Sequence, residues 1–256
     1  MEYSVLTYII GNYENIHEIN FDISNTNVEY VCVTDRKDLT SNTWKIIYDE
    51  ELDNPNLEPF EKVFRVRYNL FKYVKNDICV RIDGSIGINK PLDNIVEIFE
   101  SGNYDACLNL HIGRNSLIDE YNAWVGFRGF PIDEARKHLY YIVDEMKYDL
   151  NTKSLIEQNF SINRRSEWTD KVDNEMLSIL RGLNNGQCTR LDQTLFTAYI
   201  VKNHPDKKYL FVSDFELFRD VLVWYSHGTN IPLVCGERGN WVFYFNNKPV
   251  ETVKIN

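Results

Sequence analysis

The stretch that decides the fold reads Ile78-Cys79-Val80-Arg81-Ile82-Asp83-Gly84-Ser85-Ile86-Gly87-Ile88. Its first five residues are apolar except for one arginine, which is typical of a strand buried on both faces of a parallel sheet. The strand ends in a carboxylate, a glycine and a small hydroxyl residue. In open α/β sheets, ligands bind beyond the carboxyl ends of strands, where Asp83 could hold a cation or a ribose hydroxyl. An ordinary Asp-Gly hairpin turn remains an equal alternative.

Further apolar runs alternate with helix-like periodicity on both sides of this stretch. The expected strands are 3–10, 30–34, Ala106–Leu110, 208–212, 232–234 and 241–245. The expected helices are 60–74, 92–99, 132–147, 173–183 and 191–202, with turns at Asn185-Gly186 and 237–240. Strands that alternate with helices indicate an α/β fold, with a mostly parallel central sheet flanked by helices. No linker or repeat divides the chain, so we expect one domain over residues 1–256.

Composition sets limits on the class of protein. The 256 residues are 43% hydrophobic and 26% charged, which indicates a globular chain and excludes disorder, collagen and coiled coil. The net charge of −10 argues against a nucleic-acid surface, because phosphate contacts need lysine and arginine. Residues 60–90 differ from the rest, with seven basic against three acidic side chains and a local net charge of +4. An anionic small molecule therefore remains possible near Asp83.

Arg67 is the most informative of these basic residues. It lies between Phe64 and Phe71 on the apolar stripe of its expected helix. A desolvated guanidinium needs an anionic partner, and its planar fork suits a phosphate or a carboxylate. The partner is therefore either a bound phosphate or a carboxylate of the protein itself.

The amino terminus and the cysteines bear on the compartment. Residues 1–5 lack the basic segment of a signal peptide, and no apolar run approaches the ~20 residues of a membrane span. The five cysteines (Cys32, Cys79, Cys107, Cys188 and Cys235) are odd in number and contain no CxxC pair. We expect reduced core cysteines in a cytoplasmic protein without a transmembrane segment.

Five blocks of the first half carry a family resemblance. In chain order they are Tyr8-Ile9-Ile10-Gly11-Asn12-Tyr13-Glu14, Tyr30-Val31-Cys32-Val33-Thr34-Asp35 followed by Trp44, the helix around Arg67, Ile82-Asp83-Gly84-Ser85-Ile86, and His111-Ile112-Gly113-Arg114-Asn115 with Asp119-Glu120. Together they resemble the GT-A-type glycosyltransferases that contain the DUF616 domain. Beyond Trp124 the likeness fades, apart from Asp192-Gln193.

The resemblance implies a GT-A-like fold that binds a nucleotide-sugar in residues 1–124 and an acceptor in residues 125–256. The donor, with a UDP-sugar favoured, would lie over the carboxyl ends of the early strands. The acceptor would be a glycan or a lipid-linked molecule, as in surface polysaccharide synthesis, which would place the protein at most peripheral to a membrane. The donor-binding residues would be Tyr8, Gly11, Asp35, Arg67, Asp83, Gly84, Ser85, His111 and Arg114.

A divalent cation, Mn²⁺ or Mg²⁺, is a further expectation from the resemblance. Asp83 stands where the GT-A Asp-x-Asp motif begins, and His227 would be the second ligand. The chain departs from that motif, because Ser85 occupies the second acidic position.

The chemistry of glycosyl transfer suggests the remaining roles. Charge builds on the leaving diphosphate, so it must be neutralised by a metal or by arginine and lysine. An inverting enzyme also needs a carboxylate base, for which Asp119, Glu120 and Asp192 are the candidates. Two of them have ordinary alternatives: Glu120 can pair with Arg114 or Arg128, and Asp192 can stabilise a helix start. A retaining enzyme would need no such base.

Three functions remain for this sequence. We expect a glycosyltransferase that moves a sugar from a nucleotide-diphosphate donor to a hydroxyl acceptor. Ser85 favours the alternative of a non-catalytic nucleotide- or carbohydrate-binding protein on the same scaffold. A nucleotidyltransferase is third, because residues 11–14 are not the glycine-rich basic loop that it needs.

Overall fold

A computed structural model describes residues 1–127, 131–186, 189–233 and 241–255. The strands are β1 (Tyr3–Ile9), β2 (Val28–Thr34), β3 (Lys45–Tyr48), β4 (Ile78–Ile82), β5 (Ile86–Ile88), β6 (Ala106–Leu110), β7 (Ile156–Arg164), β8 (Tyr209–Ser213), β9 (Leu222–Tyr225), β10 (Pro232–Leu233), β11 (Phe243–Phe245) and β12 (Lys248–Val250). The helices are α1 (Pro59–Arg67), α2 (Asp93–Ser101), α3 (Leu117–Phe127), α4 (Ile132–Tyr140), α5 (Glu167–Leu183), α6 (Asp192–Asn203) and α7 (Asp214–Asp220), with a 3₁₀ turn η1 (Leu70–Lys72) and a π-helical turn η2 (Tyr141–Glu145).

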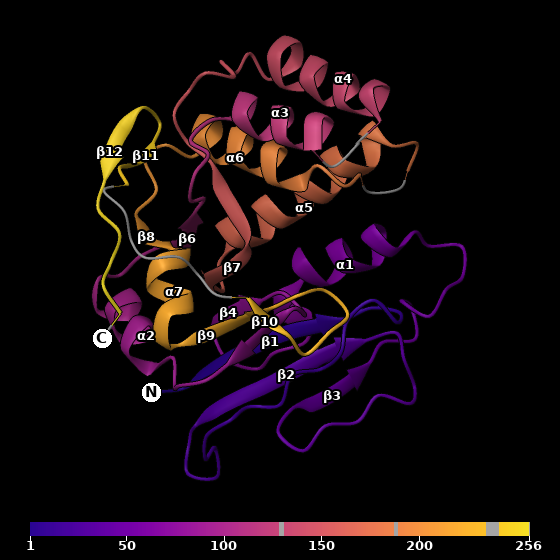
Figure 1. Cartoon of the computed structure of the whole chain (residues 1–256), viewed down its shortest axis with the longest axis vertical. Coiled ribbons are helices and arrows are strands. Elements are labelled where there is room, and N and C mark those ends of the chain that lie inside the picture. Colours follow the sequence, from indigo (N-terminus) through magenta and orange to yellow (C-terminus); the bar gives the residue numbers. More distant parts are fainter. Residues whose placement is uncertain (128–130, 187–188, 234–240, 256) are drawn as a thin grey trace.

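A seven-stranded sheet forms the centre, in the order β3-β2-β1-β4-β7-β6-β8 (Figure 1). β7 is antiparallel to both of its neighbours, whereas the other pairs within this sheet are parallel. The expected α/β fold with a mostly parallel central sheet is therefore confirmed. β7 comes from the second half of the chain and lies between β4 and β6, so the two halves share one sheet.

The order of the strands creates a switch point between β1 and β4. From β1 the sheet continues through β2 on one side and through β4 on the other. Leu6 of β1 pairs with Val31 of β2 and with Arg81 of β4, so these parallel strands end at the same edge of the sheet. Such a switch point is where open α/β sheets bind ligands.

Alternating side chains divide the core between the two faces of the sheet. Tyr3, Val5 and Ile9 of β1 pack in a buried cluster with residues of α2 and α7. Leu6 and Tyr8 point to the other face and pack in a cluster with α1 and η1. A third cluster joins α1 to α3, α4, α5 and α6 on β6 and β7. In Figure 1, α3 to α6 gather at one end of the molecule, and α2 and α7 lie near both termini.

Several element boundaries differ from the sequence expectations. The helix expected over 60–74 ends at Arg67 and resumes as the 3₁₀ turn η1 after Asn69, a residue type that favours turns over helix interiors. α5 begins six residues before its expected start, because the hydroxyl of Ser166 caps it by accepting a hydrogen bond from the amide of Thr169 (3.1 Å). The turn at Asn185-Gly186 is confirmed by the positive φ of both residues. Val234 and the turn at 237–240 lie outside the described residues.

The described cysteines are buried, as the sequence predicts. Cys32, Cys79 and Cys107 are buried free thiols, and burial raises the pKa of Cys32 to about 12. Cys188 and Cys235 lie outside the described residues. Among the described residues, no helix is long and apolar enough to cross a membrane.

Candidate functional site

The expected site residues of β1, β2 and β4 meet at the carboxyl edge of the sheet. Tyr8 is the last residue but one of β1, and Asp35 and Asp83 directly follow β2 and β4. Gly11 turns the chain after β1 with a φ of +58°, a conformation that glycine adopts without strain. The sequence therefore predicted a real juxtaposition at the switch point.

Asp35 fixes the turn after β1. One of its carboxylate oxygens accepts a hydrogen bond from the amide of Gly11 (2.7 Å), and the other pairs with the ammonium of Lys62 (2.9 Å). The side chains of Lys62 and Asp35 are only 13% and 8% exposed. Lys62 thus brings a second cation from α1 to this edge, beside Arg67.

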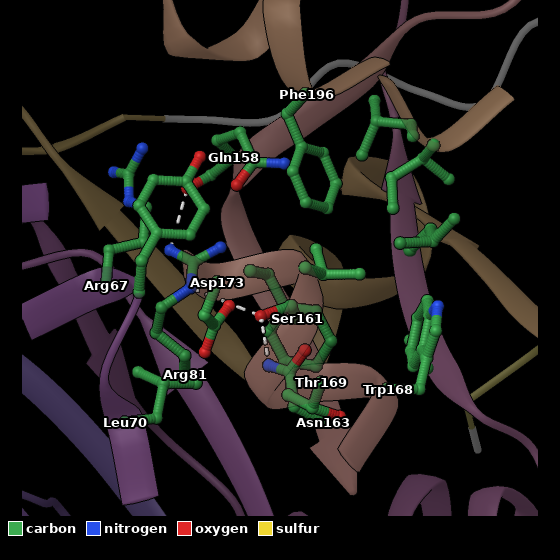
Figure 2. A pocket seen from close by; sticks show the side chains of 17 residues that line it. Arg67, Leu70, Arg81, Gln158, Ser161, Asn163, Trp168, Thr169, Asp173 and Phe196 are labelled. Carbon is green, nitrogen blue, oxygen red and sulfur yellow. Dashed lines mark hydrogen bonds between the residues drawn. The ribbon is translucent and has the colours of Figure 1, made fainter. Parts of the chain in front are cut away.

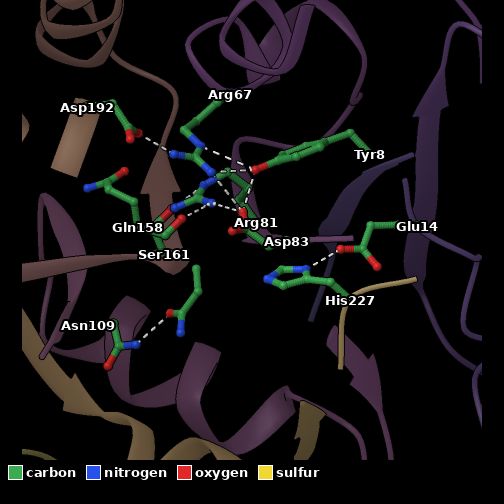
Figure 3. Close-up of polar contacts among 11 residues, drawn as sticks. Tyr8, Glu14, Arg67, Arg81, Asp83, Asn109, Gln158, Ser161, Asp192 and His227 are labelled. Carbon is green, nitrogen blue, oxygen red and sulfur yellow. Dashed lines mark hydrogen bonds and ion pairs between the residues drawn. The ribbon is translucent and has the colours of Figure 1, made fainter. Parts of the chain in front are cut away.

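Arg67 is the centre of a buried network that we call the arginine cluster, formed by Tyr8, Arg67, Arg81, Asp83 and Asp192. Arg67 donates through Nε (3.2 Å) and Nη2 (2.7 Å) to the hydroxyl of Tyr8. Nη2 also donates to Asp83 (3.0 Å), and Nη1 donates to Asp192. Figure 3 shows the Tyr8 hydroxyl pointing at this guanidinium. The partner expected for Arg67 is thus at least partly the protein's own carboxylates.

Arg81 supplies the second guanidinium of the arginine cluster. Its side chain is 2% exposed and donates to Asp83 (3.1 Å), to the carbonyl of Gln158 (2.7 Å) and to the hydroxyl of Ser161 (3.2 Å). Tyr8 also donates to the same oxygen of Asp83. Asp83 therefore receives three donors on one carboxylate oxygen, and its side chain is still 27% exposed.

The charges of the arginine cluster shift the pKa values of its members. Burial raises the pKa of Asp192, and Arg67 opposes the rise. Burial also raises the pKa of the Tyr8 hydroxyl. Burial acts to lower the pKa of Arg67, but Tyr8, Asp192 and Asp83 hold it well above the ordinary value. Arg67 is consequently a permanent cation at this edge.

The same two arginines line a small internal cavity between the sheet and α5 and α6 (Figure 2). Its volume is about 30 Å³, which has room for one or two water molecules. A nucleotide-sized ligand needs roughly ten times that volume. Such a ligand would therefore bind at the open edge of the sheet and not in this cavity.

Asp83 and Gly84 do not form a hairpin turn. β4 pairs with β1 and β7, whereas β5 leaves the central sheet and pairs with β9. A Cβ atom on Gly84 would lie 2.6 Å from the carbonyl oxygen of Tyr8, so only glycine fits against β1. Ser85 is buried, and its carbonyl accepts a hydrogen bond from the amide of Tyr225 (2.8 Å). Asp83 does begin a β-turn, since its carbonyl accepts from the amide of Ile86 (3.0 Å), but the turn does not close a hairpin.

His227 lies at the rim of the site and pairs with Glu14. Its Nδ1 contacts one carboxylate oxygen of Glu14, and the other oxygen accepts from the amide of Gly228 (3.0 Å). Glu14 lies beside Gly84, since its Cγ is 3.5 Å from the position of a Cβ there. Figure 3 shows this pair next to the arginine cluster. The contact joins the loop after β1 to the loop after β9.

The side chains present do not fit a metal ion at Asp83 and His227. Two guanidiniums and a hydroxyl already donate to Asp83 Oδ1, and a dication beside two arginines would be repelled. His227 Nδ1 pairs with Glu14, so only its Nε2 could face a ligand. Among the described residues, no three His, Cys, Asp or Glu side chains are grouped to hold a metal.

A second network, which we call the Glu157 cluster, lies at the end of β6 and contains His111, Arg114, Glu120 and Glu157. His111 Nε2 lies 3.2 Å from Glu157 Oε2 and accepts from Arg114 Nε (3.1 Å). Arg114 Nε also lies 2.8 Å from Glu120 Oε2, and the indole of Trp124 donates to Glu120 Oε1. The expected pairing of Glu120 with Arg114 is confirmed, and Arg128 lies outside the described residues.

The remaining catalytic candidate, Asp119, lies apart from both clusters. It accepts hydrogen bonds from the hydroxyl of Ser116 (2.7 Å) and the amide of Asn115 (3.2 Å), and it is exposed in the first turn of α3. These contacts are those of a helix start, where a carboxylate also meets the favourable end of the helix dipole.

Three residues at this edge were not predicted. Arg81 shares a face with Asp83, and the period of two along a strand could have indicated it. Lys62 had been counted only as part of the basic segment. Glu157 is the second residue of β7, whose alternating Ile156, Phe160 and Ile162 are a weak strand signal interrupted by polar residues.

No family model matches the chain, and no curated protein matches its sequence. The resemblance to GT-A glycosyltransferases therefore rests on its motifs alone.

Proposed function

We propose that the chain is a glycosyltransferase of GT-A fold that binds a nucleoside-diphosphate sugar across the ends of β1 and β4. The observation that carries the proposal is the switch point where Tyr8, Asp35, Arg67 and Asp83 meet. Parallel sheets bind nucleotides at such crevices. The motif resemblance supports a UDP-sugar as the donor and a glycan or lipid-linked hydroxyl as the acceptor, handled on the cytoplasmic side.

The cations of this edge supply what the reaction requires. Negative charge builds on the diphosphate as the sugar leaves, and fixed cations lower that barrier. Lys62, Arg67 and Arg114 lie near this edge, at 13%, 9% and 22% side-chain exposure. Arg67 already faces Asp83 and Asp192, so an incoming phosphate would compete with those carboxylates for it. Since the donor set does not fit a metal, no step here depends on one.

A second candidate function is a non-catalytic nucleotide- or carbohydrate-binding protein. It is favoured by the hydrogen bonds that Arg67, Arg81 and Tyr8 donate to Asp83. These bonds engage the carboxylate within the protein and leave it less available for a reaction. Turnover of a donor distinguishes this candidate from the transferase.

Calorimetry with UDP, GDP and dTDP and their sugar conjugates, with and without Mn²⁺, tests the proposal. We expect one nucleotide class to bind, and the Asp83→Ala variant to lose turnover while its fold is retained. Asp133→Asn is a matched control, because that carboxylate is 86% exposed on α4. Absence of binding by every compound, in both metal conditions, would overturn the proposal.

A further inference from the structure

We propose that Glu157 is the catalytic base that accepts the proton of the acceptor hydroxyl, with His111 as its positioning residue. This inference rests on the proposed transferase function and assigns a role to a residue outside the motifs. It implies an inverting reaction, since only that course needs a base on the acceptor.

The antiparallel course of β7 brings Glu157 to the site. Because β7 runs against β4 and β6, its first residues lie at the edge where those strands end. Glu157 pairs in register with Asn109 of β6, and the carbonyl of Asn159 accepts from the amide of Asp83 (3.0 Å). Glu157 thus lies on the same sheet edge as Asp83, two residues along β7 from Asp83's partner.

Glu157 is also partly exposed and lies beside His111. Its side chain is 17% exposed, so part of it faces solvent at this edge. His111 packs against Oε2 from the end of β6, with its Nε2 at 3.2 Å and its side chain 13% exposed. A carboxylate that lies at the ligand-binding edge of the sheet, beside a histidine and partly exposed, has the placement that a general base requires.

The other carboxylates at this edge are already bound by cations or donors. Asp192 is paired with Arg67, and Glu120 with Arg114 and Trp124. Asp119 accepts hydrogen bonds at the start of α3. Each would have to break an ion pair or a cap before it could take a proton.

The surroundings of Glu157 give it an affinity for protons that suits a base. Burial raises its pKa well above the ordinary value, and Asp214 and Glu120 raise it further. Arg114 acts in the opposite direction, Asp83 adds to the rise, and His111 faces the carboxylate directly. A base whose pKa lies nearer the working pH is more effective in proton transfer.

The proposed step balances as one displacement. The acceptor oxygen forms a bond to the anomeric carbon while its proton passes to Glu157. The bond from that carbon to the diphosphate oxygen breaks, and its electron pair leaves with the nucleoside diphosphate. The configuration of the sugar is inverted, and Glu157 returns the proton to solvent afterwards.

The test compares wild type with Glu157→Gln, using the UDP-, GDP- or dTDP-glucose that the wild type hydrolyses fastest. We expect unchanged nucleotide binding in calorimetry and a loss of hydrolysis of about 10²–10⁴-fold. Sodium azide, a nucleophile with no proton to give, should restore release of the nucleotide and form an inverted glucosyl azide. The acid limb of the wild-type pH profile should disappear in the variant. Glu167→Gln, at an exposed position of α5, is the matched control.

His111→Gln tests the positioning role. We expect it to lower hydrolysis less than Glu157→Gln and to shift the acid limb of the pH profile, whereas a merely structural change would leave that limb in place.

Each outcome decides the inference. Hydrolysis at the wild-type rate in Glu157→Gln, or a loss of activity that azide does not restore, overturns the role of Glu157 while nucleotide binding still supports the proposed site. Binding without hydrolysis in the wild type rejects the base and favours the non-catalytic alternative. Absence of nucleotide binding in the wild type rejects both proposals.

Discussion

The arginine cluster and the Glu157 cluster lie on the same sheet edge, but their charges are balanced differently. In the arginine cluster, Arg67 and Arg81 face Asp83 and Asp192. In the Glu157 cluster, the guanidinium of Arg114 forms an ion pair with Glu120, and its charge also acts on Glu157. The first network has a cation for each carboxylate, and the second has more carboxylates than cations.

This difference determines what each network can do. Burial raises the pKa of both Asp192 and Glu157, but direct contact with Arg67 counteracts the rise at Asp192. At Glu157 the neighbouring Asp214 and Glu120 add to the rise. A balanced network holds charge in place, whereas an acid-rich one favours the uptake of a proton.

The largest effect should come from unbalancing the arginine cluster. Arg67→Met keeps much of the side-chain volume but leaves Asp192 buried without its cation. Removing one partner of a buried ion pair costs about 3–5 kcal/mol, and we expect that loss in urea unfolding at pH 7. Arg136→Met, which removes an ion pair with 69% and 86% exposed partners, should cost about 0–1 kcal/mol. Equal costs for the two variants would show that the cluster is not a balanced buried unit.

A smaller and opposite effect is expected in the Glu157 cluster. Because its pKa is raised in the folded state, Glu157 stabilises the fold when protonated, and that contribution is lost as the pH rises through the raised pKa. Glu157→Gln should therefore raise the unfolding free energy at neutral pH by about 0.5–2 kcal/mol, the usual range of stabilising substitutions. The gain should shrink as the pH falls below the raised pKa. Urea unfolding of both proteins between pH 5 and pH 8 measures this gain. A loss of unfolding free energy that does not vary with pH would contradict the prediction that Glu157 is destabilising when ionised.

The smallest effect should come from the rim pair of Glu14 and His227. The change in its unfolding free energy is the reference for an exposed pair, against which the two clusters are compared. The His227 side chain is 56% exposed, so water screens the pair. His227→Gln should change the unfolding free energy by no more than about 1 kcal/mol. Thermal unfolding of all these variants checks this order. A loss of stability in His227→Gln as large as that in Arg67→Met would mean that the exposure of an ion pair does not determine its contribution to stability.

The early strands were predictable because local pattern and burial agree there. β1, β4 and β6 are mostly apolar runs, and the structure places them within one residue of the expected bounds. β7 was missed because its residues Gln158, Asn159 and Ser161 are polar. Two of these polar side chains serve the site edge: the hydroxyl of Ser161 accepts from Arg81, and the amide oxygen of Asn159 accepts from Asn109. Gln158 contributes its backbone carbonyl to Arg81.

The short strands β5 and β9 were also missed. Ile86–Ile88 had appeared only as apolar residues that resume after Ser85, and its partner lies more than 130 residues further along the chain. Pairing at that separation depends on where the rest of the chain packs, which no local pattern encodes.

The sequence by itself determined that the chain is an α/β protein whose strand at Ile78–Ile82 delivers a carboxylate to a sheet edge. It also determined that Arg67 needs an anion, because a guanidinium on an apolar helix stripe loses its water. Only the tertiary structure decided which partners it meets, since the hydroxyl of Tyr8 and the carboxylates of Asp83 and Asp192 come from three distant segments. It likewise placed Glu157 beside His111, because the direction of β7 follows from pairing with β4 and β6.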